Sequence, residues 1–162
     1  TGERLRQLIL DPDLPALDAR AEALLLLAAR AQHVAEVITP ALEGGRDVVC
    51  DRFSGSTVAY QGHGRGLDAD QLACLSRWAS AGVEPDLVVL LVVPPEVAAA
   101  RLGGRGGADR MEGEDARFFA QVESGFAALA AADPARWKVV DGAGTVEQVE
   151  ARVAAVLDGL PS

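Results

Sequence analysis

The sequence predicts an α/β domain in which a parallel β-sheet is flanked by helices. Three short apolar runs, at 47–51, 87–93 and 137–141, are typical of strands buried in a parallel sheet. They alternate with longer segments whose apolar residues recur at helical spacing, and this alternation favours parallel pairing. The 162 residues are 49% hydrophobic, which is enough for one core, so a single domain over 1–162 is expected.

The first third of the chain is predicted to be helical. Leucine and isoleucine at helical spacing indicate a short helix over 2–10, which Asp11–Pro12 ends. A longer helix is expected from near Pro15 to residue 38. Thr39–Pro40 should break it and Gly44–Gly45 should stop it, since proline lacks the N–H that a helix interior needs.

The middle of the chain alternates strand and helix signals. The run 47–51 is bounded by glycine and charge and is predicted to be a buried strand. A polar loop and two helices follow, the second over 68–81 with Asp68 as its N-cap. The run 87–93 has no polar alternation, which is typical of a parallel strand covered on both faces.

The last third begins with a helix over 96–102, opened by Pro94–Pro95. A glycine-rich basic stretch at 103–110 has few apolar anchors and is predicted to be a mobile loop, with a lid region over about 103–113. A helix over 114–132, the strand at 137–141 and a helix over 145–157 complete the expected elements.

Composition narrows the possible partners. The net charge is −9, which disfavours nucleic acids and anionic membranes as partners but allows a small anion in an arginine-lined pocket. Lys138 is the only lysine beside 14 arginines, so the phosphate-binding loop GxxxxGK[ST] is absent from these residues. Cys50 and Cys74 lie in apolar patterns and are predicted to be buried thiols of a cytoplasmic protein.

Neither a membrane span nor a signal peptide is expected. The longest apolar stretches, at 23–29 and 87–95, are far shorter than the ~20 residues that a membrane span requires. Residue 1 is a threonine, and a helical pattern follows it at once. We therefore expect these residues to come from the interior of a longer protein.

The triplet Asp51–Arg52–Phe53 directly follows a predicted strand, where open parallel sheets bind their ligands. An aspartate there can hold Mg²⁺ or its water, and an adjacent arginine can clamp a phosphate. The alternative is an N-cap aspartate beside a surface arginine. The stretch 54–67 is dense in hydroxyl and amide groups, which can bind a base and a sugar. His33 and His63 have no partner at catalytic or metal-binding spacing and are predicted to be structural.

These motifs closely resemble those of the thymidylate kinase family, whose members phosphorylate dTMP to dTDP with ATP. The triplet and the segments 59–62 and 64–67 are similar to the family's signature, and the resemblance runs from Gly2–Glu3 to Val140–Asp141. It implies a sheet like that of P-loop kinases, with the first strand and the phosphate-binding loop missing here. It also implies ATP as donor, Mg²⁺ as metal, dTMP as acceptor and a possible homodimer.

The resemblance implies roles for ten residues. Those of the acceptor site are Arg30 and Arg52 for the monophosphate, with Leu26, Thr57, Tyr60 and Gln61 around the nucleoside. Asp51 would lie beside Mg²⁺ and bind the ion through water. Lid arginines that neutralise the moving phosphoryl group would be Arg101, Arg105 and Arg110. Without the resemblance, Arg30 is explained equally well as a surface arginine paired with an acid. The alternative for Arg105 is a charge in a disordered loop.

The sequence departs from the family at several positions. Leu26 stands where a phenylalanine usually stacks on thymine, Glu123 where an arginine is usual, and Gly103 where some members carry a lid arginine. Two alternatives therefore stay open: a nucleotide-binding module without catalysis, and a kinase for another nucleoside monophosphate. Two further expectations are that Arg30 and Arg52 converge on one anion, and that 47–51 and 87–93 are separated by one missing strand.

Overall fold

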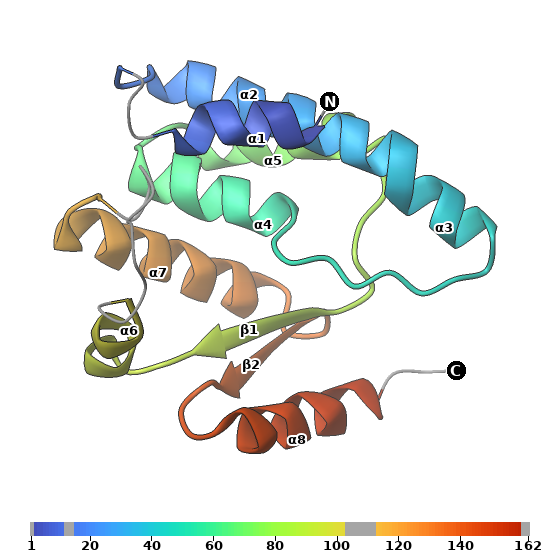
Figure 1. The fold of residues 1–162 in the computed structure, drawn as a ribbon, viewed down its shortest axis with the longest axis vertical. Coiled ribbons are helices and arrows are strands. Elements are labelled where there is room, and N and C mark those ends of the chain that lie inside the picture. Colours follow the sequence, from blue (N-terminus) through green and yellow to red (C-terminus); the bar gives the residue numbers. More distant parts are fainter. Residues whose placement is uncertain (1, 12–14, 103–112, 160–162) are drawn as a thin grey trace. The chain divides into compact units, whose positions relative to one another are not determined.

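The computed structural model describes residues 2–11, 15–102 and 113–159, which divide between two compact units (Figure 1). The first unit is Thr1–Glu84 with Ala108–Ala127, and the second is Pro85–Gly107 with Ala128–Ser162. The first unit is helical, and the second contains the sheet. The single domain expected from composition stays a prediction.

The first unit begins with two packed helices, α1 (Gly2–Leu10) and α2 (Ala19–His33). Asp18 caps α2 by accepting a hydrogen bond from the Arg20 backbone N–H at 3.0 Å, so α2 begins later than the predicted start near Pro15. The two helices lie side by side in Figure 1, and Gly2 approaches the Ala29 carbonyl closely. The predicted helix over 2–10 is confirmed.

The predicted break at Thr39–Pro40 is wrong. The chain continues from α2 through a π-helix, η1 (Val34–Ile38), into α3 (Thr39–Glu43). The Thr39 N–H bonds to the Val34 carbonyl five residues back, and Pro40 falls in the first turn of α3, where its missing N–H is tolerated. The predicted stop is confirmed, since Gly45 has a φ of +67°.

The predicted strand at 47–51 is also wrong. These residues are irregular, and Val49 is fully exposed. A β-branched run acquires strand structure only when a neighbouring backbone pairs with it, and no described segment pairs with this one. The gap expected between 47–51 and 87–93 therefore stays untested.

Three helical segments follow the triplet: α4 (Ser54–Thr57), the π-helix η2 (Val58–Gly64) and α5 (Ala69–Ala79). Asp68 is the N-cap of α5, as predicted, and accepts from the Gln71 N–H at 2.8 Å. Part of the predicted polar loop is thus helical, because its hydroxyl and amide side chains bond across to α2 and leave the backbone in helical bonding.

The core of the first unit lies where η2 meets the helix α7 (Ala116–Ala132). Buried Ala59, Phe118 and Val122 form its centre, with Tyr60, Phe119 and Phe126 packed against them. Tyr60 meets Phe118 edge-on at 6.0 Å between ring centroids. The helices approach closely because Gly64 has no side chain: a Cβ there would lie 2.6 Å from the Phe118 ring.

The second unit contains the predicted parallel pairing. Strands β1 (Val88–Val92) and β2 (Trp137–Asp141) run parallel in register from Val88 opposite Trp137 to Val92 opposite Asp141. Helices α6 (Pro95–Leu102) and α8 (Val146–Leu157) follow the two strands (Figure 1). A capping box between Thr145 and Gln148 begins α8.

Two predictions of burial are wrong. Leu91 is 50% exposed and Val139 is 62% exposed, so the faces of the two-stranded sheet of the described residues that carry these side chains are not fully covered. Cys74 is exposed and Cys50 is half-buried. Cys74 lies on the opposite side of α5 from the buried residues Leu72 and Ser76, which the apolar sequence pattern alone did not separate.

Candidate active site

Arg30 lies at the centre of the polar groups that the sequence singled out. Its Nη2 donates to Thr57 Oγ1 at 2.7 Å and to the Phe53 carbonyl at 2.9 Å, and its Nη1 donates to Ser76 Oγ at 3.4 Å. The guanidinium carbon lies 5.3 Å from the centre of the Phe53 ring. Within the part of the chain that the structure describes, these bonds use three of its five N–H groups and leave two for a ligand.

The electrostatics of Arg30 suit an anion. Burial lowers the pKa of its guanidinium to about 10, while the nearby Cys50 thiolate form acts in the opposite direction. Arg30 remains a cation at neutral pH, yet the three acceptors above are all neutral oxygens. A half-buried cation with neutral partners would be stabilised by a bound anion.

Arg52 occupies an unusual backbone conformation. Its φ is +66°, a left-handed geometry that costs a non-glycine residue about 1 kcal/mol or more. The Cys50 thiol lies 3.3 Å from the Arg52 carbonyl, and the Arg52 guanidinium carbon lies 5.0 Å from the centre of the Tyr60 ring. The turn thus directs an exposed cation along the outside of η2.

Arg30 and Arg52 contact neighbouring turns of one helical segment. Arg30 contacts Phe53 and Thr57, and Arg52 contacts Tyr60, three residues further along. Residues three apart in a helix lie on adjoining positions of its surface. The two arginines that the sequence predicted to share an anion therefore both belong to the surroundings of α4 and η2.

A second polar cluster crosses between α2 and η2. Gln61 and Glu22 are each 1% exposed, and Gln61 Nε2 donates to Glu22 Oε1 at 2.9 Å. Arg65 donates to both oxygens of Glu22, at 3.2 Å each, and pairs with Glu114 at 2.7 Å. Burial acts to lower the pKa of Arg65, but its bonds to Glu114 and Glu22 outweigh burial and raise it.

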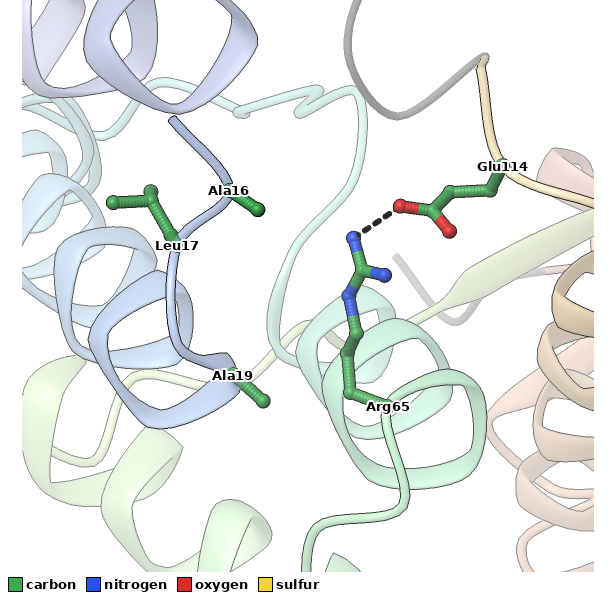
Figure 2. Close-up of a pocket in the computed structure, with 5 residues that line it drawn as sticks. All are labelled: Ala16, Leu17, Ala19, Arg65 and Glu114. Carbon is green, nitrogen blue, oxygen red and sulfur yellow. Dashed lines mark ion pairs between the residues drawn. The ribbon is translucent and has the colours of Figure 1, made fainter. Parts of the chain in front are cut away.

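Arg65 and Glu114 also line a pocket of about 150 Å³, shown in Figure 2. Ala16, Leu17 and Ala19 form the other wall, so a single ion pair provides its polar side. The sequence reading did not single out Glu22 or Glu114. The available signal for Glu22 was a carboxylate that directly precedes the apolar run 23–29 of α2.

The remaining predicted residues are more scattered. Leu26 is half-buried on α2, one turn before Arg30. Arg101 is in the second unit, where its Nη2 donates to the Gly142 carbonyl at 3.0 Å. Arg105 and Arg110 lie outside the described residues. His63 packs against Gly125, which agrees with a structural role.

Asp51 fits one carboxylate ligand of Mg²⁺. Its side chain is exposed, and Mg²⁺ is commonly held by one or two carboxylates together with water and substrate phosphates. The described residues contain no group of three or more His, Cys, Asp or Glu side chains that would hold a metal without a substrate. Among the described helices, none has the length and apolar character to cross a membrane.

Two guanidinium groups, a hydroxyl, an aromatic ring and a buried amide gather around one helical segment of this α/β protein. Such groups bind a phosphorylated nucleoside, so fold and site together define a nucleotide-binding protein. The chain belongs to the thymidylate kinase family, whose model, "Thymidylate kinase", matches residues 1–153.

Individual members of this family are similar to the chain over nearly its whole length. The chain is 48% identical to a thymidylate kinase of Solidesulfovibrio magneticus and 45% identical to one of Neisseria gonorrhoeae. Each comparison covers 98% of this chain, and it covers 79% and 76% of those two relatives. A crystal structure of thymidylate kinase from Ehrlichia chaffeensis matches with a TM-score of 0.76 at 29% identity, over 96% of this chain and 72% of that one. The predicted α/β class with a parallel sheet flanked by helices is confirmed.

Proposed function

We propose that this protein is a nucleoside monophosphate kinase that transfers the γ-phosphate of ATP to dTMP. A phosphate oxygen of dTMP attacks the γ-phosphorus, the bond from that phosphorus to the β,γ-bridging oxygen breaks, and dTDP and ADP result. The observation that carries the proposal is Arg30, a half-buried cation bonded to neutral oxygens in a chain of this family. The opposing view, a module without catalysis, has no comparable observation in its favour.

The acceptor site divides between two arginines. Arg52 is exposed, so its whole fork is available for the dTMP phosphate. Arg30 has three of its N–H groups engaged with the protein and offers the other two to the same nucleotide. Thr57, Tyr60 and Gln61 line the nucleoside pocket with Leu26, which supplies apolar contact without an aromatic face.

Asp51 would hold Mg²⁺ through a water molecule, and the ion would supply positive charge against the phosphates. Arg101, Arg105 and Arg110 act from the lid region, where guanidinium groups stabilise charge on the moving phosphoryl group. Arg101 would leave its Gly142 contact to do so. The protein works in the cytoplasm, on dTMP and ATP and without nucleic acid, and it forms a homodimer.

A coupled assay of ADP release with the full-length protein tests the proposal. Turnover is expected with dTMP and ATP, weaker turnover with dUMP, and little with other monophosphates. Turnover that prefers another monophosphate would replace dTMP as the acceptor, and Leu26 is the position to examine first. Binding of dTMP without ADP release under any condition would favour the module without catalysis.

A further inference from the structure

Glu22 is a buried carboxylate that has no role so far in the proposed acceptor site. It is 1% exposed and accepts hydrogen bonds from Gln61 and from Nε and Nη2 of Arg65. Burying a carboxylate is costly even when it is paired, and an apolar residue of similar size is often as stable. Its presence between α2 and η2 therefore calls for a role beyond packing.

The carboxylate determines how the Gln61 amide is turned. A carboxylate only accepts hydrogen bonds, so Gln61 must direct its NH₂ group toward Glu22, as the 2.9 Å bond shows. The carbonyl oxygen, Oε1, then faces the opposite way. It is buried and has no hydrogen-bond partner among the described residues. Buried acceptors in native proteins almost always receive a donor.

We propose that Glu22 is a positioning residue for acceptor binding, which holds the Gln61 amide so that Oε1 receives an N–H of the bound base. This inference rests on the proposed function. Thymine carries a donor at N3 and cytosine an acceptor, so an enforced carbonyl favours dTMP over dCMP. Without Glu22 the amide rotates about its terminal torsion, which has two comparable minima, and presents NH₂ instead.

Arg65 pairs with Glu22, and Glu114 binds Arg65 from outside the acceptor site. Arg65 reaches Glu22 with Nε and Nη2 and lies 2.7 Å from Glu114. Its guanidinium also lies 4.7 Å from the centre of the Phe118 ring, which holds it against the core. Neutralising either carboxylate by substitution thus removes one ion pair of Arg65, but only Glu22 contacts Gln61.

This asymmetry supplies a matched pair of variants, E22Q and E114Q. Both replace one carboxylate partner of Arg65 with an amide of the same shape. Calorimetric binding of dTMP and dCMP to the full-length protein, without ATP, gives the ratio of the two affinities. E22Q is expected to weaken dTMP binding about tenfold and to reduce its preference over dCMP, whereas E114Q keeps the wild-type ratio.

The ratio of the dTMP and dCMP affinities separates a positioning role from a loss of stability, because a general loss of folding weakens the binding of both nucleotides alike. Thermal unfolding of each variant is measured in parallel. If E22Q does not fold, E22D serves instead, since it keeps the charge but withdraws it from Gln61 by one methylene. A ratio for E22Q or E22D equal to that of E114Q would overturn the role of Glu22. A wild-type protein that does not bind dTMP would overturn the proposed function itself, and this inference with it.

Discussion

Arg30 on α2 and Thr57 on α4 are joined by a 2.7 Å hydrogen bond from Nη2 to Oγ1. The same guanidinium reaches the Phe53 carbonyl and Ser76 Oγ on α5, so one side chain connects three segments of the first unit. The arginine that we propose for the acceptor phosphate therefore also stabilises the fold, so the binding and the stability of its variants must be measured together.

Arg30→Lys tests this double role. The ammonium is a point charge and cannot reproduce the planar fork that serves Thr57 and Phe53 together. We expect dTMP affinity to fall about tenfold or more and the free energy of unfolding to fall by about 1–2 kcal/mol. Calorimetry and urea unfolding measure the two effects. Arg77→Lys on the exposed side of α5 is the control, and equal dTMP affinity in the two variants would remove Arg30 from the site.

Arg52 allows binding and stability to be separated. Its left-handed φ of +66° suits glycine, so Arg52→Gly relieves strain that Arg52→Ala retains. We expect the glycine variant to be more stable than the alanine variant by about 1 kcal/mol in urea unfolding. Both should lose dTMP affinity to the same extent, about tenfold or more, because both lose the guanidinium. Retained affinity in either would contradict a phosphate contact by Arg52.

Gly64 and Gly62 form a matched pair on η2. A Cβ at Gly64 would lie 2.6 Å from the Phe118 ring, whereas one at Gly62 would lie at ordinary contact, 3.5 Å from Leu72. Gly64→Ala is expected to lower the free energy of unfolding by about 1–3 kcal/mol through overpacking. Gly62→Ala should be neutral or stabilising by up to about 1 kcal/mol, since alanine favours helices. Equal melting temperatures would contradict the close approach of η2 and α7.

The two thiols should react at different rates. Burial raises the pKa of Cys50 above its ordinary 9.0, with Arg30 opposing and Asp51 reinforcing the shift. The thiolate is the reactive form, so near pH 8.5 iodoacetamide should label the exposed Cys74 well before Cys50. Labelling of Cys50 should speed up as the pH rises. Mass spectrometry of Cys50→Ser and Cys74→Ser variants assigns the sites, and faster labelling of Cys50 would contradict its burial.

Stability should follow the same shift. The pKa of Cys50 is higher in the folded state than in the unfolded state, so the folded state binds more protons once the pH exceeds about 9. The contribution of the Cys50 thiol to the free energy of unfolding is therefore present below that pH and is lost above it. Unfolding in urea at several pH values, with Cys50→Ser as control, measures this loss. A wild-type stability that declines no faster than that of the variant would argue against the shift.

Local signals were sufficient for much of the chain. The caps at Asp68 and Thr145, the helix over 2–10 and the strands at 88–92 and 137–141 follow from capping chemistry and hydrophobic runs within a few residues. The motif around Asp51–Arg52–Phe53 identified the family, which the relatives confirm. Each of these depends on residues that are neighbours in sequence.

The sequence by itself thus determined the class of the fold and the family, and it predicted the arginines of the candidate site. Only the tertiary structure decided that Pro40 lies within a continuous helical path, that 47–51 forms no strand, and that Glu22 faces Gln61. The physical reason is common to all three. Backbone pairing, helix register and the burial of a charge depend on groups brought together from distant parts of the chain, and their energies are not contained in any local window.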